Sequence, residues 1–202
     1  MTIRLLLADD QALVRGALAA LLDLEADLEV VCEVGRGDEV VAAAREYAPD
    51  VALLDVEMPG MDGISATRAL RTALPSTRVL IVTTFGRPGF LRRALQAGAD
   101  GFVVKDTPAR QLADAVRRVH AGLRVVDPAL AADSLVTGDS PLTARETEIL
   151  RAARTGSTVA AMAGVLFLSE GTVRNHLSAA MGKVGASTRA EAVQIADGHG
   201  WL

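Results

Sequence analysis

The segment LLDVEMPGMDG, residues 53–63, runs from an apolar, strand-like stretch into a carboxylate and then into a turn. Asp55 follows the apolar residues directly, and Pro59 and Gly60 break the chain soon afterwards. Charged groups are rarely buried unless they are paired. Asp55 is therefore either a loop cap or a chemical group that a partner neutralises, and the residues at the other strand ends decide between the two.

Short apolar runs alternate with helical patterns over the first 125 residues. The expected strands are Ile3–Ala8, Leu28–Val34, Val51–Leu54, Val79–Thr83 and Gly101–Val104. The expected helices are Ala12–Leu24, Asp38–Tyr47, Gly63–Thr72, Gly89–Ala97 and Pro108–Ala121. Strands that alternate with helices indicate a parallel sheet covered on both faces. The fold class is α/β, and we expect a flavodoxin-like (βα)5 domain with strand order 2-1-3-4-5.

Polar residues follow the carboxyl ends of four of these strands: Asp9 and Asp10, Asp55, Thr83 and Lys105. In an open parallel sheet, ligands collect at this edge. Three carboxylates together repel one another, and a hard divalent cation with oxygen ligands, Mg2+, resolves the repulsion. Asp55 beside that cation, with a lysine and a hydroxyl facing it, is a good phosphoryl acceptor. Any one of these residues could be a plain loop cap, but the joint pattern favours a site.

Composition and charge limit the possible classes of protein. Half of the 202 residues are hydrophobic and 3% are aromatic, so the cores consist mainly of Ala, Leu and Val. Residues 1–133 hold 15 Lys+Arg against 19 Asp+Glu, whereas residues 134–202 hold 6 against 6, so the net charge of −4 is all N-terminal. The single cysteine, Cys32, excludes an internal disulfide. The N-terminus does not resemble a signal peptide and no apolar run approaches ~20 residues, so we expect a soluble, cytoplasmic protein.

The remaining chain has a different character. Residues 126–140 are rich in Asp, Pro, Gly and Ser, and we interpret them as a linker. Four helical patterns follow: one that opens with a Thr143/Glu146 capping box, then Val159–Leu166, Glu170–Val184 with Ser169 as N-cap, and Arg189–Asp197. The sequence therefore predicts an all-α domain over residues 141–202.

The third of these helices, Glu170–Val184, has one apolar and one polar face. Val173, Leu177, Ala180, Met181 and Val184 form a buried stripe, while Gly171, Arg174, Asn175 and Ser178 lie elsewhere. A short helix, a turn and a polar-faced helix are typical of a helix-turn-helix, whose second helix enters the DNA major groove. Arg174 could then pair with guanine and Asn175 with adenine.

At this point a resemblance can be named. Residues 1–125 resemble the receiver domain of a two-component response regulator, through Asp9-Asp10, the run DVEMPGMDG from Asp55 to Gly63, Thr83 and Lys105. The resemblance implies that Asp55 takes a phosphoryl group from a sensor histidine kinase. It also implies that Asp10, Asp55 and the backbone carbonyl of Glu57 hold Mg2+, with Asp9 assisting through water. Phe102 occupies the position of the family's switch aromatic, and an ordinary core phenylalanine is an equally good interpretation.

Residues 141–202 resemble the LuxR/NarL (FixJ) output domain, through PLTARETEIL, LSEGTVRNHL and KVGASTRAEAV. The implied DNA-contact residues are Thr172, Arg174, Asn175, Ser178 and Lys183, and the implied state on phosphorylation is a homodimer on promoter DNA. Ala160 stands where lysine is usual, and Ser178 stands at a position that is basic in some members. With a neutral domain we expect weak non-specific DNA affinity and a need for dimerisation.

Three further interpretations stay open. TTFGRPGF, residues 83–90, and the terminal GWL resemble the DesR-type branch, whose kinases respond to membrane lipid fluidity and whose targets include a desaturase gene. The chain could instead be a receiver with a degenerate output domain that does not bind DNA. A remote alternative is a phosphatase of the haloacid-dehalogenase kind, which would carry its nucleophile on the first strand. We expect no enzyme activity beyond phosphorylation and dephosphorylation at Asp55.

Overall fold

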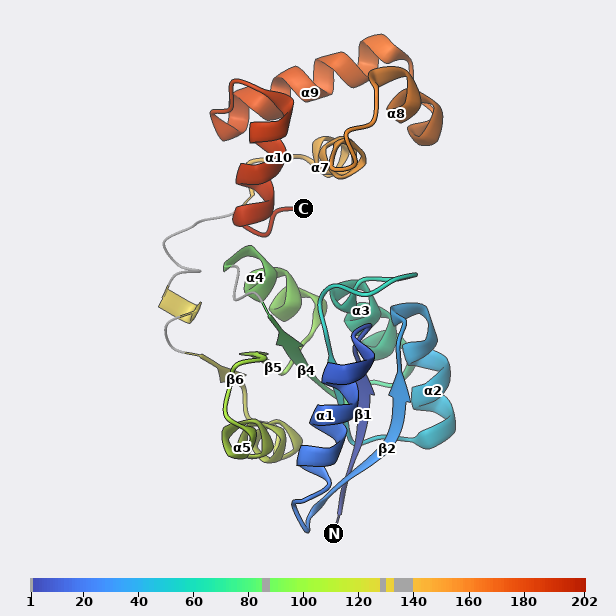
Figure 1. Ribbon diagram of the computed structural model, residues 1–202, viewed down its shortest axis with the longest axis vertical. Coiled ribbons are helices and arrows are strands. Elements are labelled where there is room, and N and C mark those ends of the chain that lie inside the picture. Colours follow the sequence, from blue (N-terminus) through green and yellow to red (C-terminus); the bar gives the residue numbers. More distant parts are fainter. Residues whose placement is uncertain (1, 85–87, 128–129, 133–139) are drawn as a thin grey trace. The chain divides into compact units, whose positions relative to one another are not determined.

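The protein is described by a computed structural model in which residues 2–84, 88–127, 130–132 and 140–202 are placed (Figure 1). The chain forms two compact units: most of the first 132 residues belong to one, and residues 133–202 to the other. Each unit is described by itself. The predicted linker at residues 126–140 and the segment at 83–90 lie partly outside the described residues.

The first unit is built on a six-stranded sheet in the order β2-β1-β3-β4-β5-β6, in which every neighbouring pair is parallel. The strands are β1 (Ile3–Ala8), β2 (Leu28–Val34), β3 (Val51–Leu54), β4 (Arg78–Thr83), β5 (Gly101–Val104) and β6 (Val125–Val126). The predicted strand order 2-1-3-4-5 is confirmed. β6 is an addition at the edge, where Val126 pairs with Phe102 although we expected Val126 to begin the linker.

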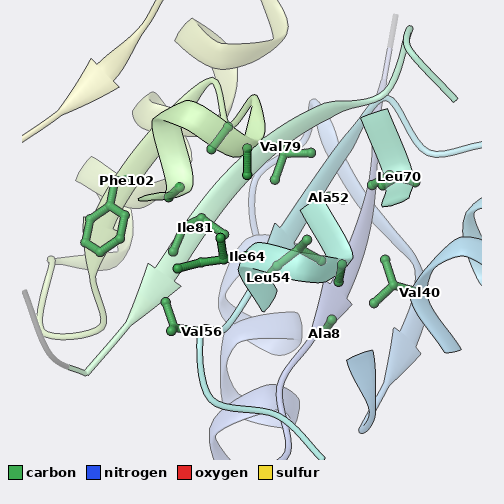
Figure 2. Packing of buried hydrophobic residues seen from close by; sticks show 14 of the residues in the cluster. Ala8, Val40, Ala52, Leu54, Val56, Ile64, Leu70, Val79, Ile81 and Phe102 are labelled. Atoms are coloured by element: carbon green, nitrogen blue, oxygen red, sulfur yellow. The ribbon is translucent and has the colours of Figure 1, made fainter. Parts of the chain in front are cut away.

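In the part of the chain that the structure describes, helices α1 to α5 cover both faces of this sheet. They are α1 (Ala12–Leu22), α2 (Val40–Tyr47), α3 (Gly63–Ala73), α4 (Pro88–Ala97) and α5 (Ala109–His120). The strand residues alternate between two cores: Leu6 and Ala8 pack with α2, α3 and α4, as Figure 2 shows for part of that cluster, while Leu5 and Leu7 pack with α1 and α5. Burial of apolar residues on both sides explains why the strands show no polar alternation.

In the first unit, two helix boundaries differ from expectation by two residues, and the other differences are of one residue. The residues before α2 form a 3-10 turn, Gly37–Glu39, instead of the first turn of an α-helix. A Cβ atom at Gly37 would lie 1.9 Å from the carbonyl oxygen of Met61, so the chain approaches the β3–α3 loop too closely for a side chain there. α1 ends two residues early, because the Asp23 carboxylate accepts a hydrogen bond from the N–H of Val30 and turns the chain toward β2.

The second unit consists of α7 (Ala144–Ala153), α8 (Val159–Leu166), α9 (Glu170–Val184) and α10 (Arg189–Gly198). Each of these helices begins at a hydroxyl residue whose side chain accepts a backbone N–H: Thr143, Thr158, Ser169 and Thr188. The predicted capping box is present, since Glu146 also accepts the N–H of Thr143 at 2.7 Å. The four helices enclose one apolar core, and α8, a turn and α9 are arranged in the order of a helix-turn-helix.

None of the helices in the described part of the chain is long and apolar enough to cross a membrane.

Candidate functional site

The carboxyl ends of β1, β3, β4 and β5 carry the polar residues expected there from the sequence: Asp9, Asp10, Asp55, Thr83 and Lys105. The parallel register continues past the strand ends: Asp55 N–H donates to the Ala8 carbonyl at 2.8 Å, and Lys105 N–H donates to the Thr83 carbonyl at 2.8 Å. This register brings residues from four separate strands to one edge of the sheet, as the topology requires.

Three carboxylates meet at this edge. Asp9, Asp10 and Asp55 each offer an oxygen, and these oxygens lie within 4.8 Å of one another. Asp9 and Asp55 are buried, whereas Asp10 is exposed. An all-carboxylate oxygen set without histidine or cysteine fits Mg2+, which binds proteins through one or two carboxylates and keeps several waters. The exposed Asp10 leaves the solvent side open to those waters.

Lys105 lies against both buried carboxylates. Its Nζ is 2.7 Å from Asp9 Oδ2 and 2.9 Å from Asp55 Oδ2. Burial raises the pKa of Asp55, and the ion pair with Lys105 only partly offsets that rise. Burial also works against the charged form of Lys105, but hydrogen bonds to Asp9 and Asp55 outweigh it and raise the pKa of the ammonium. The ammonium therefore offsets part of the negative charge of the two carboxylates in the absence of a metal ion.

Backbone groups fix the two buried carboxylates, and no side-chain pattern could have indicated them. The N–H of Val56 donates to Asp55 Oδ1 at 2.7 Å, and the N–H of Gln11 donates to Asp9 Oδ1 at 2.9 Å. One oxygen of each carboxylate is thus held by the backbone and the other by Lys105. Because Val56 and Gln11 act through their backbone N–H groups, the identity of their side chains does not indicate this role in the sequence.

The other predicted residues of this unit lie as follows. Thr83 is buried at the last position of β4, beside β5 and Lys105. Phe102 is fully buried in the core under α4, which Figure 2 shows at one end of the cluster. Glu57 is exposed in the turn that follows β3. The structure therefore brings Thr83 and Lys105 to the acidic edge, and it places the Phe102 side chain in the core.

On α9, the predicted DNA-contact residues divide into two groups. Arg174, Asn175 and Ser178 are exposed, and Arg174 forms an ion pair of 2.5 Å with Glu170 one turn earlier. Lys183, at the other end of the helix, forms an ion pair of 2.7 Å with Glu146 of α7.

Thr172, the fifth predicted contact residue, is half-buried. Its hydroxyl lies 2.8 Å from the hydroxyl of the N-cap residue Ser169. Both basic side chains of α9, Arg174 and Lys183, are therefore paired with carboxylates in the absence of DNA.

The chain combines an acidic cluster at the carboxyl edge of a parallel α/β sheet with a helix-turn-helix unit. This combination defines the class of a signal-responsive DNA-binding protein. Comparisons with known proteins give the family. A family model described as "Response regulator receiver domain" matches residues 5–117, and one described as "Bacterial regulatory proteins, luxR family" matches residues 140–196. The chain belongs to the two-component response regulators with a LuxR-type DNA-binding domain.

Two curated relatives cover almost the whole chain. The uncharacterized transcriptional regulatory protein YvfU of Bacillus subtilis is 42% identical over 200 residues, which are 99% of this chain and 100% of the relative. The transcriptional regulatory protein DesR of Bacillus subtilis is 38% identical over 200 residues, with 99% of each chain covered. The likeness therefore extends across both units.

Solved structures agree with this assignment. The response regulator ChrA of a heme-sensing two-component system is 35% identical, covers 100% of this chain and 99% of its own, and gives a TM-score of 0.60. A complex of the response regulator RcsB with DNA gives a TM-score of 0.67 with 98% of this chain and 99% of that chain covered. At 22% identity, RcsB supports the fold alone.

Proposed function

We propose that Asp55 accepts a phosphoryl group from the phosphohistidine of a sensor kinase. One oxygen of the Asp55 carboxylate attacks the phosphorus, a P–O bond forms, and the P–N bond to the kinase histidine breaks. The observation that carries this proposal is the 2.9 Å contact between Lys105 Nζ and Asp55 Oδ2, which places a cation on the attacking group. Positive charge at this point stabilises the charge that develops on the phosphoryl oxygens.

Asp10, Asp55 and the Glu57 carbonyl are the groups proposed to hold Mg2+, with Asp9 assisting through water. When bound, the ion would offset the charge of the carboxylates and so reduce the electrostatic repulsion between the attacking oxygen and the incoming phosphoryl group. In the structure both oxygens of Asp9 already have partners, the N–H of Gln11 and the ammonium of Lys105, which supports the less direct role proposed for Asp9. The donor set is thus charged, oxygen-only and open to water on the Asp10 side, as Mg2+ requires.

We further propose that the new phosphoryl group draws Thr83 and Lys105 toward its oxygens. Phosphorylation adds about 1.5–2 negative charges to the pocket. Phe102 lies on β5, three residues before Lys105, and packs in the core beneath α4, so movement of β5 would be transmitted to that face of the unit. A shift of this kind would favour one of two conformations of the surface around α4 and β5, the one in which two protomers form a homodimer.

In the output unit, Thr172, Arg174, Asn175, Ser178 and Lys183 are the residues proposed to contact promoter DNA. The N-terminal part of α9 would meet base edges, with Lys183 at the far end nearer the phosphates. Two protomers would engage half-sites about one helical turn apart.

Because the proposed target is promoter DNA, we propose that the protein acts in the cytoplasm. Resemblance to the DesR-type branch extends the hypothesis to membrane-lipid genes, which footprinting across the genome would test.

The proposal is tested with Asp55→Asn and an acyl-phosphate donor in the presence of Mg2+. We expect intact-mass analysis to show phosphoryl incorporation in the wild type and none in Asp55→Asn, while circular dichroism shows that the variant folds. Asp106→Asn is the matched control, because Asp106 is an exposed carboxylate directly after Lys105. Full labelling of Asp55→Asn would refute the assignment.

A further inference from the structure

Arg15, on the second turn of α1, connects the acidic edge to β2. Its Nη1 donates to the backbone carbonyl oxygen of Asp9 at 2.5 Å, and its Nε lies 3.4 Å from Oε2 of Glu33. The side chain is 20% exposed, and it lines a small pocket together with Asp9 and Asp55. Its guanidinium is thus hydrogen-bonded to a backbone oxygen beside the acidic cluster, while the buried Nε has no hydrogen-bond partner among the described residues.

The atom that Arg15 holds is a backbone oxygen, that of Asp9. The carbonyl of Asp9 belongs to the peptide bond between Asp9 and Asp10, and that peptide group is planar and rigid. A hydrogen bond to its oxygen therefore restrains the orientation of the plane, and with it the position of the Asp10 Cα from which that side chain starts. Asp9 is already fixed through Gln11 and Lys105, whereas Asp10 is exposed and depends on its backbone for its direction.

We propose that Arg15 is a positioning residue for the divalent-cation site, which it serves by holding the Asp9–Asp10 peptide so that the Asp10 carboxylate meets those of Asp9 and Asp55. The proposal rests on the proposed function of the acidic cluster as a cation site. Groups that orient the ligands of a metal without touching it typically change its affinity 10–100-fold when they are removed. The Glu33 carboxylate lies 3.4 Å from Nε without a hydrogen bond and is the less important of the two contacts.

Electrostatics and positioning predict opposite signs for the loss of Arg15. If Arg15 acts only through its charge, its removal takes a positive group away from a cation site and tightens cation binding. If it positions Asp10, its removal weakens binding even though the net charge of the site becomes more favourable. The direction of the change in affinity therefore separates the two roles.

The experiment measures Mn2+ binding to the full chain by electron paramagnetic resonance of the free ion, with Mg2+ as competitor. Arg15→Met keeps the packing of the apolar stem and removes the guanidinium. We expect it to weaken Mn2+ binding about tenfold or more. Arg15→Lys retains the charge and one donor for the carbonyl, and we expect it to recover most of the affinity. Glu33→Gln leaves the bond to Asp9 in place and is expected to change binding little.

Arg36→Ala is the matched control, because it removes the same charge from an exposed residue two positions after β2 that pairs with Asp38. We expect its affinity to stay within about twofold of the wild type, since an exposed pair contributes little. Unchanged or tighter binding by Arg15→Met would overturn the proposal. Failure of the wild type to bind Mn2+ would instead refute the cation site itself. If circular dichroism shows that Arg15→Met is unfolded, Arg15→Gln replaces it. We expect Arg15→Gln to weaken Mn2+ binding to the same extent, and unchanged or tighter binding would again overturn the proposal.

Discussion

The ammonium of Lys105 lies 2.9 Å from the carboxylate of Asp55, and both side chains are almost completely buried. The two residues are 50 positions apart in the chain and come from the ends of β3 and β5, which are not neighbours in the sheet. Removal of one partner from a buried ion pair leaves an uncompensated charge, which is far more costly than the loss of an exposed pair. The contact therefore bears on stability as well as on the proposed chemistry.

Lys105→Ala should lower the free energy of unfolding by up to about 3 kcal/mol in a chelator, because two buried carboxylates lose their cation. Burial already raises the pKa of Asp55, and without Lys105 that pKa rises further. A carboxyl group whose pKa is raised on folding holds its proton in the folded state after the unfolded chain has lost it. Its contribution to stability is therefore lost as the pH rises through the raised value.

Urea unfolding of wild type and Lys105→Ala, followed by circular dichroism at about pH 5 and about pH 8, measures this effect. The difference between the two proteins should be larger at the higher pH, and Mg2+ should reduce it. An equal difference at both pH values would contradict the account of Lys105 as the partner of ionised carboxylates.

Gly63→Ala should destabilise the first unit by about 1–3 kcal/mol, the usual cost of overpacking. A Cβ atom at Gly63 would lie 1.8 Å from the carbonyl oxygen of Asp55, so the β3–α3 loop has to move. Gly16→Ala is the matched control, because a Cβ there meets nothing within 4 Å in the middle of α1. That change should stabilise by about 0.5–1 kcal/mol through helix propensity. Equal effects of the two substitutions in urea unfolding would contradict the predicted clash.

Thr143→Ala should destabilise the second unit by about 1 kcal/mol, the typical cost of losing an N-cap. The Thr143 hydroxyl accepts the N–H of Glu146, while the Glu146 side chain accepts the N–H of Thr143 and pairs with Lys183. The only tryptophan, Trp201, packs against the core of this unit, so its fluorescence reports the transition. Thr143→Ser keeps the acceptor and should be nearly neutral; a loss as large as that of alanine would exclude capping as the cause.

The sequence predicted those features that depend on local patterns. The five main strands and the capping box at Thr143 follow from apolar runs and from residue types a few positions apart, and the strand order was expected from the flavodoxin-like fold that such an alternation indicates. The acidic edge was also predictable, because a parallel sheet brings the carboxyl ends of its strands together. The LuxR-type assignment of residues 141–202 likewise rested on a contiguous motif, and the match over residues 140–196 confirms it.

Contacts that join distant residues were not predictable. β6 has two residues, too few for a recognisable period, and it exists because Val125 and Val126 lie against β5. Lys183 was predicted as a DNA contact from the resemblance to the LuxR/NarL output domain, and its pairing with Glu146, 37 positions earlier, appears only in three dimensions. The role of Arg15 was missed for the same reason, since its partner is a backbone carbonyl.

Arg174→Ala should reduce specific DNA binding by about 1–3 kcal/mol, the value of one good contact between arginine and guanine. The side chain is exposed near the N-terminal part of α9, and Glu170 holds its guanidinium at that end of the helix. Binding of the phosphorylated protein to its own promoter region and to random DNA, measured at several salt concentrations, tests this. The ratio of the two affinities should fall.

Arg151→Ala is the control for charge, because Arg151 is exposed on α7, outside the helix-turn-helix, and its removal changes the net charge equally. We expect Arg151→Ala to weaken binding to promoter DNA and to random DNA to the same small extent, so that the ratio of the two affinities stays unchanged. The basic side chains of α9 are both paired with carboxylates, so little non-specific affinity is available to mask a lost base contact. If Arg174→Ala and Arg151→Ala gave the same ratio, α9 would not read the sequence through Arg174; if the wild type bound neither DNA, the output unit would have lost DNA binding altogether.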